Sequence, residues 1–388
     1  MTSHPIYCVA VLLLIEGVVL TLAQRPIGKK LFKYLPSMFW IYFLPMLVTT
    51  ADLLPPANPA YDWIGKWILP AALVLLLLSA DVRGILRLGS MALRVMAAAT
   101  CGIMIGAIAA SMLFRSWLPE EAWKAIGALS GSWIGGSANM LAVGKAVETP
   151  ESLMGVIAIV DTLFSYVWMG MLIAVSVLQE RFDRRNRSHT ALIQELTQRA
   201  GKASLSGKRG LTVGSLVWIA LIAVAGAGAA VWLSGKMPPI KNVLNSAAYA
   251  VILATVIGVL LSFTPARKLE SRGSNTVGFA LLYLVLASIG AKTHLGLVRS
   301  VPVFLMVGAT MLIIHGVCLF IAARLFRAPM ALVATASQAN VGGPASAPVV
   351  AGIYHPELAP VGLLLAVCGN ILGTFLGIMV SQVCRWVG

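Results

Sequence analysis

One carboxylate lies in the middle of a long apolar segment. Asp161 sits in the stretch MGVIAIVDTLFSYVWMG, with Thr162 beside it and Ser165 one helical turn further on. A charged carboxylate at the centre of a bilayer costs at least about 2.5–3.5 kcal/mol, so it normally binds a cation, carries a proton or meets a partner. We predict that Asp161 and Thr162 bind a coupling ion. The alternative is a carboxyl group that burial and a hydrogen bond keep neutral.

Further polar residues lie in two glycine-rich segments, residues 131–144 (GSWIGGSANMLAVG) and residues 337–352 (SQANVGGPASAPVVAG). Their neutral oxygens suit Na⁺ or a hydrogen-bonded substrate, and hydrogen bonds between helices are the alternative. We predict that the ion site also includes Asn139, Gln338 and Asn340. The predicted substrate-binding residues are Ser137, Gly135, Gly136, Gly342, Gly343, Ser346 and Asn370, the last of which follows the second segment.

Three other ionisable residues are candidates for a proton relay or a gate. His315, in the stretch LIIHGV, can relay protons, and a hydrogen-bonded core histidine is the alternative. Asp81 and Lys292 end two similar stretches, LLLLSAD and LASIGAK, and are candidates for a gating pair. Snorkelling of both side chains to the membrane interface is the alternative. Glu16 lies in the first apolar segment, where we expect a helix contact.

The elements that must position these residues are membrane helices. Of the 388 residues, 59% are hydrophobic and 11% charged, whereas soluble domains are about a quarter charged. Twelve apolar segments have about the length that crosses a hydrocarbon core of about 30 Å, and in lipid they must be helical. We therefore predict an all-α, multi-pass protein of a bacterial inner membrane. The segments are 5–24, 35–55, 63–80, 92–114, 123–147, 152–178, 211–234, 243–263, 276–297, 300–325, 329–353 and 358–384.

The two glycine-rich segments are unsuited to a continuous helix. Pro344 and Pro348 remove backbone donors, and the Gly-Gly pairs loosen the helix. A break at membrane depth exposes backbone polar groups, which costs several kcal/mol unless something polar occupies them. Half-helix ends attract ions, and two such segments at matching places are the best sequence indication of a transporter's site. The alternative is that the glycines only allow close helix packing.

The two segments are also copies of each other at a spacing of 207 residues. Gly135 and Gly136 match Gly342 and Gly343, and five further identities fall within the next forty residues. Asp161 matches Cys368, so the carboxylate lies outside the symmetry. The repeat predicts an N-terminal half (1–178, broken helix 131–144), a basic cytoplasmic linker (179–210) and a C-terminal half (211–388, broken helix 337–352).

Loop charge predicts the orientation of each half, because Lys and Arg are retained in the cytoplasm. The basic loops are 25–34 and 81–91 in the first half, and 179–210, 264–275 and 324–328 thereafter. Taken separately, the halves run in opposite directions, as an inverted repeat should. Taken together they conflict, because five predicted spans separate residue 34 from residue 179. We expect that one segment does not cross the membrane.

Several function classes are disfavoured. The net charge of +15 lies in short loops between apolar segments, which argues against nucleic acid as a partner, and the five cysteines lack metal-ligand spacing. The chain has no G-x-x-x-x-G-K-[ST], no H-E-x-x-H, no G-x-S-x-G and no T-V-G-Y-G. These absences disfavour an ATP-driven pump, a hydrolase and a channel. We expect no enzyme activity and no cofactor, with Na⁺ considered only as a coupling ion.

The segments GSWIGGSANMLAVG and ASQANVGGPASAPVVAGIY, with LLLLSADVRGILRLG and LASIGAKTHL, resemble the membrane family named domain of unknown function 819. That family is similar in plan to the bile acid:sodium symporter and cation:proton antiporter superfamily. The resemblance implies a panel domain, a core domain with two crossing broken helices, and a homodimer formed through the panel. It also places Asp161 where such antiporters carry an ion-binding aspartate, although Asp161–Thr162 replaces a pair of acids.

Together these features predict a Na⁺- or H⁺-coupled symporter for a small organic, anionic solute. The solute would meet the half-helix ends, and rocking of core against panel in the bilayer would give alternating access. One alternative is a Na⁺/H⁺ antiporter that uses Asp161. The alternative of another class is a membrane sensor or scaffold without transport, in which the polar breaks are structural only.

Overall fold

The computed structural model describes residues 4–25, 37–201, 211–240, 245–292, 301–355 and 358–387, and they form an all-helical, multi-pass membrane protein. Eight helical segments are long and apolar enough to cross a membrane. They are α1 (Pro5–Gln24), α4–α5 (Pro59–Leu78, through a π-helical turn at Ile64–Ile68), α7 (Gly89–Leu113), α10–α11 (Glu151–Asn186), α13 (Val213–Ser234), α15 (Ser274–Ala291), α16 (Val301–Phe326) and α19 (Ala359–Val387).

Contacts between α5 and α15 define the two ends of the molecule. Ser79, after α5, donates to Asn275 at the start of α15 (2.9 Å), while Lys292, after α15, donates to Asp62 in α4 (2.9 Å). The two helices are therefore antiparallel. We call the first end the Asp81 end and the second the Lys292 end. A shorter apolar helix, α14 (Ser246–Ser262), begins at the Lys292 end, where Asn245 donates to Glu148, and ends at the cavity beside Asp81. With this bent segment, up to nine helical segments of the described chain can cross. Helix α3 (Ser37–Thr50) packs on the end of α15, where Thr49 donates to the Ala291 carbonyl (2.8 Å).

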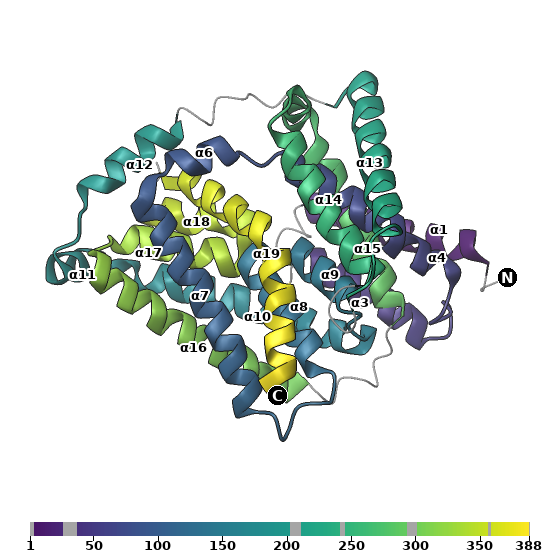
Figure 1. Cartoon of the computed structure of the whole chain (residues 1–388), viewed down its shortest axis with the longest axis horizontal. Helices are drawn as coiled ribbons and strands as arrows, with labels where there is room; N and C mark the ends of the chain where they lie inside the picture. Colours follow the sequence, from purple (N-terminus) through teal and green to yellow (C-terminus); the bar gives the residue numbers. More distant parts are fainter. Residues whose placement is uncertain are drawn as a thin grey trace.

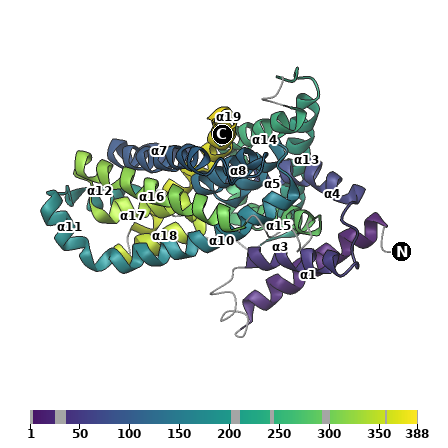
Figure 2. The ribbon, with the colours of Figure 1, turned by 90° about the horizontal axis from the view of Figure 1, so that it is seen from below.

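The helices form two lobes (Figure 1). Lobe 1 contains α1, α3, α4, α5, α13, α14 and α15, and lobe 2 contains α7, α8, α10, α16, α17, α18 and α19, with α9 touching both. Figure 2 places the N-terminus, with α1 and α4, toward one end of the long axis and α11 (Gln179–Asn186) and α12 (Ala191–Gly201) at the other. Each lobe takes helices from both sequence halves, so the halves interlock and are not separate bodies.

The first glycine-rich segment is a re-entrant hairpin. Helix α8 (Ala122–Gly135) ends at Gly136 and α9 (Ser137–Ala146) begins there. A Cβ on Gly131 would lie 2.9 Å from Cγ2 of Val143. Twelve residues of continuous helix span about 18 Å, so α9 must fold back along α8. Its end shares a cavity with Asp62 and Lys292, so the hairpin starts and finishes at the Lys292 end.

The second glycine-rich segment is also a hairpin, inserted from the opposite end. Helix α17 (Met330–Val341) and α18 (Gly343–Tyr354) are joined at Gly342. The Met330 N–H donates to Asp183 (2.9 Å), and the Tyr354 hydroxyl donates to the Leu172 carbonyl (2.7 Å). Both contacts are with the last part of α10–α11, so this hairpin starts and finishes at the Asp81 end.

The prediction of twelve crossing segments is therefore wrong at 123–147 and 329–353, which return to the end where they began. Both hairpins contain enough apolar residues for a span, which is why hydropathy counted them. Their return removes the conflict in loop charge. Between the basic loops 81–91 and 179–210 the chain now crosses twice, through α7 and α10, so residues 81–91 and the described residues 179–201 lie at the same end. Loops 264–275 and 324–328 lie at this Asp81 end too, whereas residues 26–36 are outside the described part of the chain.

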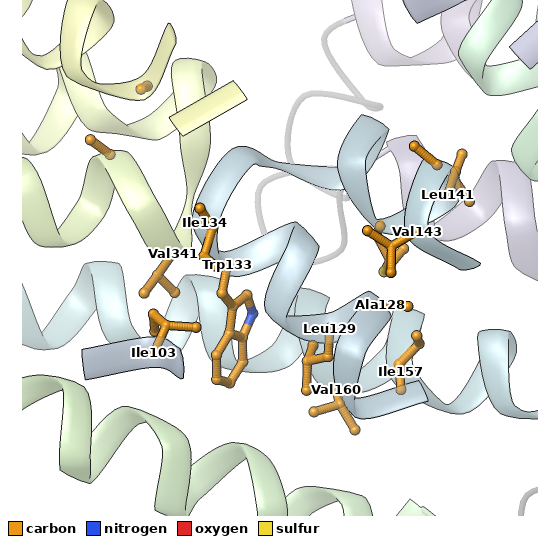
Figure 3. Packing of buried hydrophobic residues seen from close by; sticks show 14 of the residues in the cluster. Ile103, Ala128, Leu129, Trp133, Ile134, Leu141, Val143, Ile157, Val160 and Val341 are labelled. Carbon is orange, nitrogen blue, oxygen red and sulfur yellow. The ribbon is translucent and has the colours of Figure 1, made fainter. Parts of the chain in front are cut away.

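Small residues hold the first hairpin against α19. A Cβ on Gly127 would lie 3.0 Å from the Gly377 carbonyl oxygen, and one on Gly373 would lie 2.9 Å from Cα of Gly135. Glycines spaced by four residues let helix backbones approach closely in membranes. Close packing, the alternative considered for the glycines, thus explains Gly135. Figure 3 shows the apolar packing on the other side of α8, where Trp133 lies among Ile103, Ile134 and Val341.

Candidate functional site

The tips of the two hairpins meet in the middle of the molecule. Gly136 has φ +81° and ψ 173°, and Gly343 has φ +65°. Both conformations are in regions that side chains disfavour, which explains glycine at these two positions. A Cβ on Gly343 would lie 3.7 Å from Cα of Gly136. The chain therefore brings four half-helix ends together at one point.

Two asparagine side chains donate hydrogen bonds to the Gly135 carbonyl, which the first break exposes. The Gly135 carbonyl accepts from Nδ2 of Asn139 (2.5 Å) and from Nδ2 of Asn370 (2.5 Å). The Thr374 hydroxyl then donates to Oδ1 of Asn139 (2.5 Å). These bonds satisfy the last carbonyl of α8, which has no partner within its own helix. The structure thus brings together, at the tip of the first hairpin, Asn139 from the predicted ion site and Asn370 from the predicted substrate site.

Each hairpin is also capped by a side chain from another element. Asn340 in α17 donates to the Ile134 carbonyl of α8 (3.3 Å) and accepts from the Thr100 N–H of α7 (3.0 Å). Ser165 in α10 donates to the Val341 carbonyl, at the end of α17 (3.0 Å). Asn340 therefore connects the two hairpins, and Ser165 connects the second hairpin to the helix that carries Asp161.

Asp161 is buried between α10 and α8. Its Oδ1 accepts hydrogen bonds from the Ser132 hydroxyl (2.9 Å) and from the indole N–H of Trp133 (2.9 Å). None of the ion pairs among the described residues includes Asp161. Two neutral donors partly compensate a carboxylate in a dry site, and a proton or a cation has to supply the rest. Asp161 contacts α8 one turn before the break, not the tip itself.

Gln338 contains a buried polar atom without a partner. Its Nε2 donates to the Ser346 hydroxyl across the second hairpin (2.7 Å), while its Oε1 has no hydrogen-bond partner. An unsatisfied buried carbonyl oxygen costs about 1–3 kcal/mol, and a bound cation or donor would offset this. Ser137 and Thr162 are half-buried and make no side-chain hydrogen bond to another described residue.

His315 lies in a complete hydrogen-bond chain. Nδ1 is 2.9 Å from the Ala99 carbonyl and Nε2 is 2.8 Å from the Ser337 hydroxyl, which also accepts from the Trp168 indole (2.8 Å). If the ring is neutral with its proton on Nδ1, each of these hydrogen bonds has one donor and one acceptor. The geometry therefore supports the core-histidine alternative over the proton relay.

The structure does not pair Asp81 with Lys292. Asp81 binds Arg267 (3.0 Å) and caps α6 (Val82–Arg87) at the N–H of Gly84 (2.8 Å), whereas Lys292 binds Asp62 (2.9 Å) and Glu151 (3.0 Å) at the other end of the molecule. The predicted gating pair is wrong because α5 and α15 are antiparallel, which places their last residues a membrane thickness apart.

Lys292 instead joins the two lobes at its own end. It follows α15 of lobe 1, and Glu151 begins α10 of lobe 2. Burial alone lowers the pKa of Lys292, but its bonds to Asp62 and Glu151 and their charges outweigh burial, so the pKa lies above its ordinary value. The ammonium group therefore stays charged. Beside it, a cavity of about 280 Å³ lies between the lobes and is lined by Gly65, Lys145, Glu148 and Ser288, among others.

Four residues of this region were absent from the predicted site: Ser132, Trp133, Ser337 and Thr374. The sequence contained a partial signal, since Ser132, Trp133 and Ser337 lie within the two glycine-rich segments. In the sequence, Trp133 is one apolar residue among many, and only the fold shows that its N–H faces a carboxylate. Thr374 lies one turn after Asn370 and gave no signal of its own.

The comparisons with known proteins agree with a membrane protein of this kind. The chain is 27% identical over 348 residues to the uncharacterized membrane protein YjcL of Bacillus subtilis (strain 168), which covers 86% of each chain. The family model described as "Protein of unknown function (DUF819)" matches residues 10–387. This match spans both lobes and both hairpins, and the chain therefore belongs to the DUF819 family.

Proposed function

We propose that the protein is a cation-coupled secondary transporter for a small organic anion. The observation that carries this proposal is the meeting of two re-entrant hairpins, inserted from opposite ends, beside a buried carboxylate without a cationic partner. Broken helices at mid-membrane are stable only where they line a cavity or bind something polar. A pure scaffold has no need for such a costly arrangement, which is why the proposal favours transport over a structural role.

The hairpin tips suit an anionic group. Among the first-turn amides of α9, those of Asn139 and Met140 donate to the Gly136 carbonyl, while those of Ser137 and Ala138 precede any intrahelical acceptor. Helix N-termini present N–H groups and a partial positive charge to anions. A carboxylate of the solute is therefore the group that we assign to Ser137 and the facing turn at Gly343.

The cation belongs beside Asp161 in this proposal. The carboxylate already has two donors, and a Na⁺ ion or a proton would complete the neutralisation. Ser165 is within hydrogen-bond reach of Asp161, and it also donates to the Val341 carbonyl at the tip of the second hairpin. A change in the charge of Asp161 would therefore alter the hydrogen bonds at the tips. Coupling would arise because the solute and the cation stabilise the same closed arrangement of hairpins.

Alternating access would require the lobes to move relative to each other. The Lys292 bond to Glu151 connects the two lobes at one end, while Asp62, in α4 of lobe 1, holds the Lys292 side chain in place. In this proposal these bonds form a latch that breaks when that end opens. Lys292 thus keeps a gating role, with partners different from the one that the sequence suggested.

The test is transport by the purified protein in liposomes, with Asp161→Asn and the matched control Glu120→Gln, which removes an exposed carboxylate from the loop before α8. A screen of carboxylate metabolites by thermal stability, with and without Na⁺, first identifies the solute. Symport predicts gradient-driven uptake in wild type and Glu120→Gln and none in Asp161→Asn.

Other outcomes separate the alternatives. Proton release on addition of Na⁺ without any solute would indicate a Na⁺/H⁺ antiporter, which the single buried carboxylate also permits. If Asp161→Asn kept every ion and solute effect, the assigned cation site would be wrong. A folded protein that no ion or solute stabilises would support the sensor or scaffold.

A further inference from the structure

A second cavity lies at the Asp81 end, away from the hairpin tips. It has a volume of about 440 Å³ and lies between the start of α6 and the turn that follows α14. That turn is a 3₁₀ helix, η3 (Pro265–Arg272). The cavity wall carries six charged side chains, which are Arg83, Arg87, Arg267, Lys268, Asp81 and Glu270.

The positive charges of this cavity exceed the negative ones by two, four against two. The charge of Arg267 is already balanced by Asp81, because the two side chains form an ion pair at 3.0 Å. Arg83, Arg87 and Lys268 take part in none of the ion pairs found among the described residues. The hydroxyl groups of the wall are already committed, because those of Ser262, Thr264 and Ser271 donate to backbone carbonyls of their own turns. Recognition therefore rests on two guanidinium groups and one ammonium group.

The position of the cavity favours a phosphate group. It follows the ends of α5 and α14, two membrane helices, so it lies at the level of lipid headgroups. Loop charge predicts that this end faces the cytoplasm, where anionic lipids attract basic residues. Guanidinium groups bind phosphate oxygens through paired, charge-assisted hydrogen bonds.

We propose that the cavity between α6 and η3 binds a phosphate group through Arg83, Arg87 and Lys268. The group can belong to the headgroup of an anionic phospholipid or to a soluble phosphate compound. The cavity also joins the lobes, because α6 packs on α19 of lobe 2 while η3 continues α14 of lobe 1. Occupation would therefore stabilise the present arrangement of the lobes. This site is independent of the proposed transport site.

The experiment measures the thermal unfolding of the full-length protein in two settings. In detergent, inorganic phosphate is added and compared with KCl at equal ionic strength. In lipid nanodiscs, phosphatidylcholine alone is compared with phosphatidylcholine containing phosphatidylglycerol. The variants are Arg83→Gln/Arg87→Gln and Lys268→Gln, and the control is Arg272→Gln, which removes an exposed cation from the same 3₁₀ helix outside the cavity wall.

We expect phosphate or phosphatidylglycerol to raise Tm by at least about 2 °C in wild type and Arg272→Gln, and the increase to vanish in Arg83→Gln/Arg87→Gln. A response in nanodiscs alone identifies a lipid headgroup, and a response to free phosphate identifies a soluble compound. An equal response to KCl, an equal loss in Arg272→Gln, or no response in either setting would overturn the proposal.

Discussion

The indole N–H of Trp133 donates a 2.9 Å hydrogen bond to the carboxylate of Asp161, and it joins the first hairpin to the helix beside it. Trp133 is fully buried among apolar residues (Figure 3). Its ring therefore contributes packing and its nitrogen contributes one bond to a buried charge. The two contributions can be separated by substitution, which leads to the first prediction.

Trp133→Phe should destabilise the protein by about 1.5–3 kcal/mol from the lost bond to a charged group, with a smaller packing loss added. The measurement is equilibrium unfolding in a mild detergent. Trp117→Phe is the matched control, because Trp117 is 67% exposed, and it should change stability by less than about 0.5 kcal/mol. Equal effects of the two substitutions would contradict the assigned role of the Trp133 N–H.

Gly136→Ala should destabilise the first hairpin by about 1–3 kcal/mol, because its φ and ψ fall in a region that is essentially restricted to glycine. Gly228→Ala is the control. Gly228 lies inside α13, and a Cβ there meets nothing within 4 Å, so this change should be neutral or stabilise by up to about 1 kcal/mol. Thermal unfolding of the two variants should give shifts of opposite sign, or a loss for Gly136→Ala alone. A stable Gly136→Ala variant would show that the break does not need this conformation.

The re-entrant hairpins can be tested by labelling single cysteines in a cysteine-free background with a membrane-impermeant maleimide. Glu120→Cys and Glu148→Cys flank the first hairpin and should react from the same side of the membrane. Arg327→Cys and His355→Cys flank the second hairpin and should both react from the opposite side. Reaction of Glu120→Cys and Glu148→Cys from different sides would mean that residues 123–147 cross.

Lys292→Gln should loosen the contact between the lobes at the Lys292 end. Half-exposed ion pairs of this kind contribute about 0.2–1 kcal/mol each, so the protein should remain folded while the cavity opens more often. Ser288→Cys, a buried position in the cavity wall, then reports opening through faster labelling. Lys236→Gln removes a cation at the same end that forms no ion pair with any described residue, and it should leave the labelling rate unchanged.

The latch also has a defined dependence on pH. Because the pKa of Lys292 is raised above its ordinary value, the ion pairs are fully present at neutral pH and weaken only when the pH rises through the raised pKa. Labelling of Ser288→Cys, corrected for the thiolate fraction with an exposed cysteine, should therefore stay constant from pH 7 to about 9. An increase within that range would contradict the assigned charge state.

Several residues of the candidate site could be recognised in the sequence because polar side chains are unusual within apolar segments. Asp161, Asn139 and Asn340 are polar at membrane depth, and the structure finds partners for each in or beside the hairpins. The partners themselves were not predictable. Trp133 and Thr374 have no unusual pattern, and the pairs that they form connect positions 28 and 235 residues apart in the chain.

The sequence by itself determined that the chain is a multi-pass helical membrane protein with two glycine breaks 207 residues apart and one carboxylate outside their symmetry. Apolar length and glycine torsions are local properties, so they can be recognised locally. The tertiary structure decided that each broken segment turns back, because a glycine with positive φ permits a reversal without requiring it. The reversal is selected by the packing of α8 and α9 on α19, and that same packing brings Gly136 to Gly343 and Trp133 to Asp161.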